Sequence, residues 1–249
     1  MLRPRLKSYC DVLRLSDRSD IAAPGPGEEV VVAELGNPQQ VMTLCEGVTA
    51  IVHLGGISTE KTWESILEAN IAGMVHLYEG ARKHGVRRIV FASSNHVTGF
   101  YRQDEVISPK DPVRPDGFYG LSKAFGENLA QLYWDKHGIE TVSIRIGSSF
   151  AEPSDRRMLA TWMSFDDTER LVVAALTAPI VGHTVIYGMS DNANTFWDNT
   201  SARHIGYRPR DSSDPFRVSV EARQQVIDSS QATARYQGGG FVAQGPFFD

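Results

Sequence analysis

The chain has 249 residues, of which 41% are hydrophobic and 22% charged, a composition typical of a soluble globular protein that can bury a core. Its formal net charge of −5 argues against nucleic acid or an anionic membrane surface as a partner. The sequence has two cysteines, no apolar stretch of membrane-spanning length, no signal peptide and no metal-binding histidine spacing, so we expect a cytoplasmic protein without a metal.

Strand-like and helix-like segments alternate over the first 150 residues. Apolar runs rich in β-branched residues indicate strands, and apolar residues at helical spacing closed by glycine indicate helices. In chain order, the expected elements are strand 11–17, strand 30–33, helix 38–45, strand 50–54, helix 63–84, strand 88–93, helix 119–137, strand 141–146, helix 158–178 with an internal start near residue 166, and strand 184–187.

This order of elements predicts an α/β fold. Apolar strands that alternate with helices favour a Rossmann-like, doubly wound parallel sheet with helices on both faces. The alternation loosens after residue 150. We therefore expect residues 1–148 to form a dinucleotide-binding core, and residues 149–249 to form a small substrate-side lobe and tail that do not fold independently.

Three of the expected strands end in residues that suit ligand binding. The strand 11–17 ends at Asp17, the strand 50–54 runs into Gly55 and Gly56, and the strand 88–93 leads into the serine and asparagine residues of SSNH at 93–96. Ligands of open parallel sheets bind beyond the carboxyl ends of the strands. These loops are therefore the expected location of the functional site.

Tyr119 and Lys123 form the strongest chemical constellation in the sequence. They lie four residues apart on an expected helix, so their side chains share one face. A nearby ammonium favours the phenolate and would lower the pKa of Tyr119, which could then take a proton from a substrate hydroxyl. Taken alone, such a pair is more often an exposed helical pair. Its combination with Asp17, the Gly-Gly loop and the serines is more specific.

Six stretches of the sequence match a known pattern: IVHLGGIS at 51–58, RIVFASSNHVTGFY at 88–101, RPDGFYGLSKAFGENLA at 114–130, RIGSSFAEP at 145–153, RMLATW at 157–162 and QGGGFV at 237–242. Through them the chain resembles the extended short-chain dehydrogenases/reductases and, within that family, the uronate dehydrogenases. The likeness runs over nearly the whole chain.

The resemblance implies a role for each candidate residue. Tyr119 would be the general base, Lys123 would modulate its pKa and hold the nicotinamide ribose, and Ser94 would bond the reacting hydroxyl. Glu34 stands where the family usually has an aspartate that contacts adenine. The implied cofactor-binding residues are Asp17, Glu34, Leu35, Leu54, Gly55, Gly56, Tyr119 and Lys123, and the implied substrate-binding residues are Ser58, Ser94, Asn95, His96, Tyr119, Ser148 and Arg157.

Plainer roles compete with several of these assignments. Asp17 could cap a turn, and the two glycines could serve only a tight turn. Arg157 could form a surface salt bridge, although a guanidinium fork also suits the carboxylate of a uronate. Asn95 and His96 could merely satisfy backbone groups of their loop. Phe241 could approach the substrate or pack on a neighbouring subunit.

The implied reaction is NAD-dependent oxidation of a hexuronate, D-galacturonate or D-glucuronate, at C1 to an aldarolactone by hydride transfer. NADP is a minor alternative, because Arg18 could meet a 2′-phosphate. The second hypothesis is a nucleotide-sugar epimerase or dehydratase on the same scaffold, and the third is a catalytically silent protein that binds a ligand or a partner. We expect a small sugar acid as the partner, no nucleic acid or membrane, and a homo-oligomer.

The family opens with a strand and a glycine-rich turn whose amides bind the pyrophosphate, and neither precedes Asp17 here. Residues 2–8 match the end of the helix that would follow, so roughly 15 residues are expected to be missing. The missing strand would leave a gap in the sheet with two unpaired edges. We therefore expect the chain as written to bind NAD weakly and to have little activity.

Overall fold

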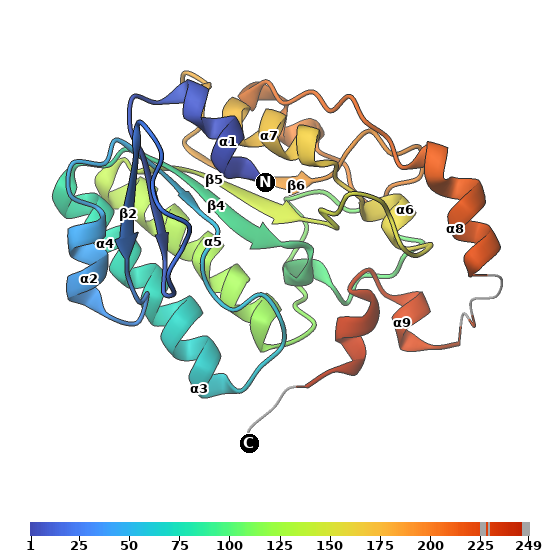
Figure 1. The fold of residues 1–249 in the computed structure, drawn as a ribbon. Helices are drawn as coiled ribbons and strands as arrows, with labels where there is room; N and C mark the ends of the chain where they lie inside the picture. The colour runs from blue at the N-terminus through green and yellow to red at the C-terminus, as the bar shows by residue number, and fades with distance from the viewer. Residues whose placement is uncertain (225–227, 229, 246–249) are drawn as a thin grey trace.

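The computed structural model describes residues 1–224, 228 and 230–245, and within them parallel strands form two separate sheets. In the first, β1 (Leu13–Asp17) pairs with β2 (Glu28–Val32). The second has the order β3 (Ala50–His53), β4 (Arg88–Ser94), β5 (Glu140–Ile146) and β6 (His183–Gly188). The predicted parallel α/β fold is confirmed (Figure 1).

The helices surround these sheets. They are α1 (Leu2–Leu6), α2 (Pro38–Leu44), α3 (Trp63–Ile66), α4 (Gly73–His84), α5 (Phe118–His137), α6 (Met158–Thr161), α7 (Phe165–Thr177), α8 (Arg217–Arg223) and α9 (Ala232–Arg235). The shorter or wider turns are η1 (Lys7–Tyr9), the π-helical η2 (Leu67–Ala72), η3 (Asn95–Thr98), η4 (Thr200–Ile205), η5 (Asp214–Phe216) and η6 (Gly239–Ala243). No helix in the described part of the chain is long and apolar enough to cross a membrane.

Helices cover both faces of the four-stranded sheet, as predicted. On one face, Phe91 of β4 packs with Leu77 and Tyr78 of α4 and with Tyr133 of α5. These two long helices run along the same side of the sheet in Figure 1. Both end at a glycine in the left-handed conformation, which a residue without a Cβ adopts at little cost.

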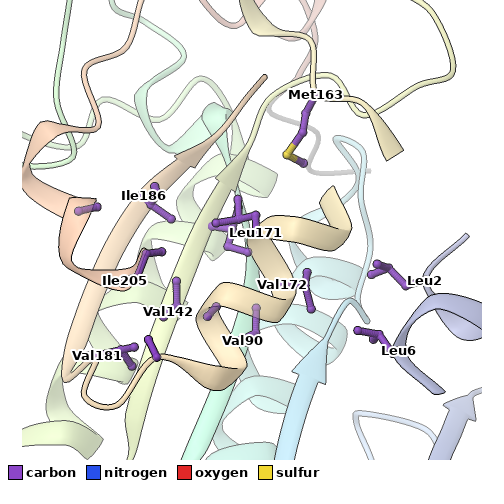
Figure 2. Packing of buried hydrophobic residues seen from close by; sticks show 14 residues of the cluster. Leu2, Leu6, Val90, Val142, Met163, Leu171, Val172, Val181, Ile186 and Ile205 are labelled. Carbon is purple, nitrogen blue, oxygen red and sulfur yellow. The ribbon is translucent and has the colours of Figure 1, made fainter. Parts of the chain in front are cut away.

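The other face is covered by α7 and α1. Val90 of β4 and Val142 of β5 pack there against Leu171 and Val172 of α7, with Leu6 of α1 at the margin, as Figure 2 shows. The strand β6 and the helix α7, which both follow residue 149, thus belong to the same sheet and core as the preceding residues. The division into two parts at residue 148 stays a prediction.

The structure differs from two of the predicted helices. The segment 63–84 is helical throughout, but its middle, η2, is π-helical. The single helix predicted at 158–178 is wrong, because Trp162 is extended and separates α6 from α7. The internal start is real: the Ser164 hydroxyl accepts from the amide of Asp167 at 2.8 Å and caps α7.

The two sheets are not hydrogen-bonded to each other. The β1–β2 unit is held instead by packing of α2 on α4 and by Arg14 of β1, whose guanidinium donates to the carbonyl oxygens of Leu44 and Glu46. Among the described residues, no strand pairs with the second edge of β1 or with that of β3. A seam between the two sheets agrees with the gap that the sequence analysis expects.

Candidate active site

The carboxyl end of β4 meets the start of α5 and forms the candidate active site. Ser94 is the last residue of β4, and Tyr119 and Lys123 lie one turn apart on α5. All three are buried, with 4%, 7% and 6% of their surface exposed, respectively. The alternative that Tyr119 and Lys123 form an exposed helical pair is therefore wrong.

The electrostatics of Tyr119 differ from the sequence-based prediction. Burial raises the pKa of Tyr119 above its usual value, and a hydrogen bond with Ser94 only partly opposes this. The ammonium of Lys123 donates to the carbonyl oxygen of Ala92 at 2.8 Å and lies 5.7 Å from the centre of the Tyr119 ring. Burial lowers the pKa of Lys123 to about 8. Burial thus outweighs the lowering expected from a nearby ammonium, and the role of Lys123 in modulating the pKa of Tyr119 stays a prediction.

A second group of predicted residues lies beside this centre. The side-chain amide of Asn95 donates to the carbonyl oxygen of Ile146 at 3.0 Å and accepts from Nη2 of Arg157 at 2.8 Å. Nε of Arg157 donates to the carbonyl oxygen of Gln237 in the tail, and burial lowers the pKa of this guanidinium. Arg157 makes no salt bridge within the described residues. The surface salt-bridge alternative is therefore wrong.

His96 and Ser148 are also buried near the strand ends. The Nδ1 atom of His96 lies 2.7 Å from the Asp116 carboxylate, and its ring stacks on Phe241 with 3.8 Å between the ring centres. The Ser148 hydroxyl pairs with that of Thr161 at 2.9 Å. Phe241 thus lies against the candidate site of its own chain.

The residues assigned to cofactor binding lie on the two sides of the gap between the sheets. Asp17 is exposed at the end of β1, where its carboxylate accepts from the amide and the hydroxyl of Ser19 at 3.1 Å, so it does cap a turn. Glu34, exposed, and Leu35 follow β2. Beyond β3, a Cβ added at Gly55 would lie only 3.1 Å from the Leu35 side chain.

Gly56 occupies a conformation that requires glycine, with φ of 109°, and a Cβ there would lie 2.7 Å from the Asn70 oxygen. Asn70, in the π-helical turn, accepts from the amide of Ile57 at 2.8 Å and donates to the Ser122 hydroxyl at 2.9 Å. The π-turn thereby ties the Gly-Gly loop to α5, one residue from Lys123. Leu54 and Ser58 are exposed, and neither side chain bonds to another predicted site residue within the described chain.

These positions fit the two ends of NAD. Asp17 and Glu34 offer carboxylates that can accept from ribose and adenine donors, and carboxylates disfavour a 2′-phosphate. Gly55 and Gly56 present exposed backbone that lacks side chains, and Lys123 stands at the end of β4 beside Tyr119. Asp17, Glu34 and the Gly-Gly loop would hold the adenosine side of the cofactor, and Lys123 the nicotinamide side.

Two buried carboxylates of the site, Glu60 and Asp116, are not among the residues that the sequence predicts. Glu60 accepts from the backbone amides of Phe118 and Tyr119, at 2.8 and 2.9 Å, and so caps the start of α5. Asp116 holds His96. Glu60 lies 58 residues from its partner Phe118 in the sequence, and no local pattern announces such a contact. Asp116 stands inside the motif RPDGFYG, but only the structure gives it a partner.

Other features of the described residues do not add to this site. A surface hollow of about 650 Å³ lies between α1, α7 and the residues after η4, and ion pairs of Arg5 with Asp166 and Glu169 line it. None of the predicted site residues borders it. The part of the chain that the structure describes holds no cluster of three or more His, Cys, Asp or Glu residues that could bind a metal.

Comparison with known proteins agrees with this geometry. Residues 3–177 match the NAD dependent epimerase/dehydratase family. The chain is 56% identical to a uronate dehydrogenase of Pseudomonas putida, over 99% of this chain and 92% of the relative. It superimposes with a TM-score of 0.97 on a mutant uronate dehydrogenase from Agrobacterium tumefaciens complexed with NAD, at 46% identity, over 100% of this chain and 94% of that one.

A glucuronic acid dehydrogenase from Chromohalobacter salexigens is similar as well, with a TM-score of 0.96 and 48% identity over 98% of this chain and 92% of that one. These relatives match nearly the full length of the chain. The chain therefore belongs to the NAD dependent epimerase/dehydratase family and, within it, to the uronate dehydrogenases.

Proposed function

We propose that this protein oxidises a hexuronate, D-galacturonate or D-glucuronate, at C1 to the aldarolactone, with NAD as cofactor and Tyr119 as general base. One observation carries the proposal. Tyr119 and Ser94 lie at the carboxyl end of β4, and Arg157 is linked through Asn95 to the end of β5, so an acid–base centre and a guanidinium share one buried site.

The guanidinium of Arg157 suits the substrate carboxylate. Its Nε and Nη2 atoms already donate to Gln237 and Asn95, and these bonds fix the orientation of the fork. Its Nη1 atom has no hydrogen bond in the described part of the chain. A carboxylate placed there gains charge-assisted hydrogen bonds in a partly desolvated site. Arg157 thereby orients the sugar with C1 toward Tyr119.

Tyr119 takes the proton from the C1 hydroxyl, and the hydrogen bond between Ser94 and Tyr119 stabilises the phenolate that this step needs. The Ser94 hydroxyl also donates to the developing alkoxide oxygen. When bound, NAD supplies the acceptor for the hydride that leaves C1. Lys123 contributes a buried ammonium on the same face of α5 as Tyr119 and stabilises negative charge there.

Formation of NADH from NAD and either uronate tests the proposal directly. Tyr119→Phe removes the hydroxyl and keeps the ring, and we expect a loss of at least about 100-fold in kcat. Tyr133→Phe is the matched control, because Tyr133 lies on the same helix but bonds to Glu79 away from the site. Interconversion of nucleotide sugars without net NADH would favour an epimerase. Binding of uronate without any turnover would favour a silent protein.

The remaining expectations concern the substrate class, the oligomeric state and the location of the enzyme. A sugar acid as substrate agrees with the names of the relatives. Assembly into a homo-oligomer and a cytoplasmic location stay predictions, and light scattering on the purified protein measures the first of them.

A further inference from the structure

We propose that Asp116 is a positioning residue of the substrate site: it fixes the His96 imidazole with its proton on Nδ1, so that Nε2 accepts a hydrogen bond from a hydroxyl of the sugar. This inference rests on the proposed function and deepens it. It assigns a role to the buried carboxylate and states which kind of substrate group His96 recognises.

The first observation is the contact between the two side chains. One oxygen of Asp116, Oδ2, lies 2.7 Å from Nδ1 of His96, and the Asp116 side chain is 0% exposed. The other oxygen, Oδ1, is buried without a hydrogen-bond partner within the described residues. A carboxylate only accepts hydrogen bonds, so its partner Nδ1 must carry the proton. Among the described residues, His96 is then the only polar group that bonds to this carboxylate.

The second observation is that three glycines are packed around this pair. A Cβ at Gly99 would lie 1.9 Å from Oδ2 of Asp116, and one at Gly238 would lie 2.0 Å from the same atom. A Cβ at Gly120 would lie 2.3 Å from the carbonyl oxygen of His96. The loop after η3, the helix α5 and the C-terminal tail each approach the pair with backbone alone. The carboxylate therefore has little room to turn away from His96.

The third observation concerns the rest of the imidazole ring. Phe241 stacks on its face, and Tyr119 meets it edge-on with 5.7 Å between the ring centres. No hydrogen bond reaches Nε2 in the described part of the chain. This nitrogen therefore stays available to a ligand, on a ring that contacts the proposed base.

The tautomer decides what Nε2 can bind. With the proton on Nδ1, the neutral ring has an acceptor at Nε2, which pairs with a hydroxyl donor and not with a carboxylate or a carbonyl. His96 therefore selects a hydroxyl of the sugar, whereas Arg157 selects the carboxylate. A site that hydrogen-bonds a substrate hydroxyl rejects analogues that lack it more strongly than an apolar pocket can.

Long-range proton–nitrogen NMR spectra of protein labelled with nitrogen-15, recorded at mildly alkaline pH, test the tautomer without any cofactor or turnover. His96→Gln assigns the signal among the seven histidines. We expect His96 to carry its proton on Nδ1 in the wild type. In Asp116→Asn, the amide can donate to Nδ1, and we expect the proton to move to Nε2. Asp111→Asn is the control, because Asp111 binds Ser108 and does not contact His96.

A proton on Nε2 in the wild type overturns the proposal even if no variant can be prepared. An unchanged tautomer in folded Asp116→Asn overturns it as well. Failure of this inference and failure of the proposed function are distinguishable. If only the proposed function is wrong, neither uronate yields NADH, but His96 still carries its proton on Nδ1.

Steady-state kinetics test whether Asp116 affects catalysis through His96. We expect Asp116→Asn to lower kcat/KM for the uronate about 10- to 100-fold, as loss of an outer partner of a functional histidine typically does. The same substitution in a His96→Gln background should change kcat/KM less than about threefold, because its effect passes through the lost ring. Additive losses in the double variant would mean that Asp116 acts only on structure, and they would overturn the proposal.

Discussion

Arg145 of β5 and Glu127 of α5 form a two-pronged ion pair in the interior, with Nε–Oε1 and Nη2–Oε2 distances of 2.9 and 2.8 Å. The two side chains are 3% and 5% exposed. The Ser93 hydroxyl also donates to Glu127, and Arg145 reaches the hydroxyl of Tyr187. This network locks α5 to the strands β4, β5 and β6 one turn beyond Lys123.

Breaking this pair on one side should destabilise the fold strongly. Arg145→Met leaves the Glu127 carboxylate buried without its charged partner, and we expect the free energy of unfolding to fall by about 3–5 kcal/mol in urea titrations. Arg102→Met, which removes the exposed pair with Asp104, should cost less than about 1 kcal/mol. Adding Glu127→Leu to Arg145→Met should restore much of the loss, and no recovery would contradict this account.

The buried Lys123 should make stability depend on pH. Its pKa is about 8 in the folded protein against a usual value of 10.5, so between these values the unfolded chain binds more protons. The free energy of unfolding of the wild type, relative to Lys123→Met, should therefore rise with pH over this interval, by roughly 3 kcal/mol in all. Urea titrations at pH 7, 9 and 10.5 measure it. A difference that does not change with pH would show that Lys123 is not desolvated.

Glu60 should be required for the position of the proposed base. Glu60→Ala removes the acceptor of the first two amides of α5, and we expect a loss of about 1–2 kcal/mol in stability with a lower kcat. Glu64→Ala, at an exposed position of the neighbouring α3, is the control and should leave kcat unchanged. If both variants behaved alike, capping of α5 by Glu60 would be unimportant.

Arg157 should determine the preference for acidic sugars. Arg157→Lys keeps a charge but loses the fork, and we expect KM for the uronate to rise about 10- to 100-fold. Turnover of the corresponding neutral hexose should change little, because it has no carboxylate to bind. Steady-state kinetics with galacturonate and galactose, side by side, measure the difference. An equal rise in KM for both sugars would place the carboxylate elsewhere.

Local sequence patterns predict the elements of this fold well. Strand 141–146 and helix 119–137 appear within one residue of β5 and α5, because apolar periodicity and a closing glycine are properties of the segment itself. The π-turn at Leu67–Ala72 leaves the periodicity nearly intact and so is not visible in it. The acidic residues near 166 predict the start of α7, but the break before it depends on the extended conformation of Trp162, which no local pattern shows.

The site could be predicted only in part. Ser94 and Tyr119 stand where strand ends and helix spacing place them, and the structure brings them together. The rise in the pKa of Tyr119 could not be predicted from spacing, since burial depends on the packing of the whole domain. Glu60 and Asp116 find their partners 58 and 20 residues away, and such contacts follow from the tertiary fold alone.

The separation of β1–β2 from the four-stranded sheet has a mechanical consequence. Asp17 belongs to one unit and Lys123 to the other, and helix packing rather than a strand ladder sets their spacing. A dinucleotide that reached both would act as a brace across the seam. Binding of NAD would then reduce the motion of the β1–β2 unit relative to the other sheet. We expect amide hydrogen exchange in β1 and β3 to slow when NAD is added.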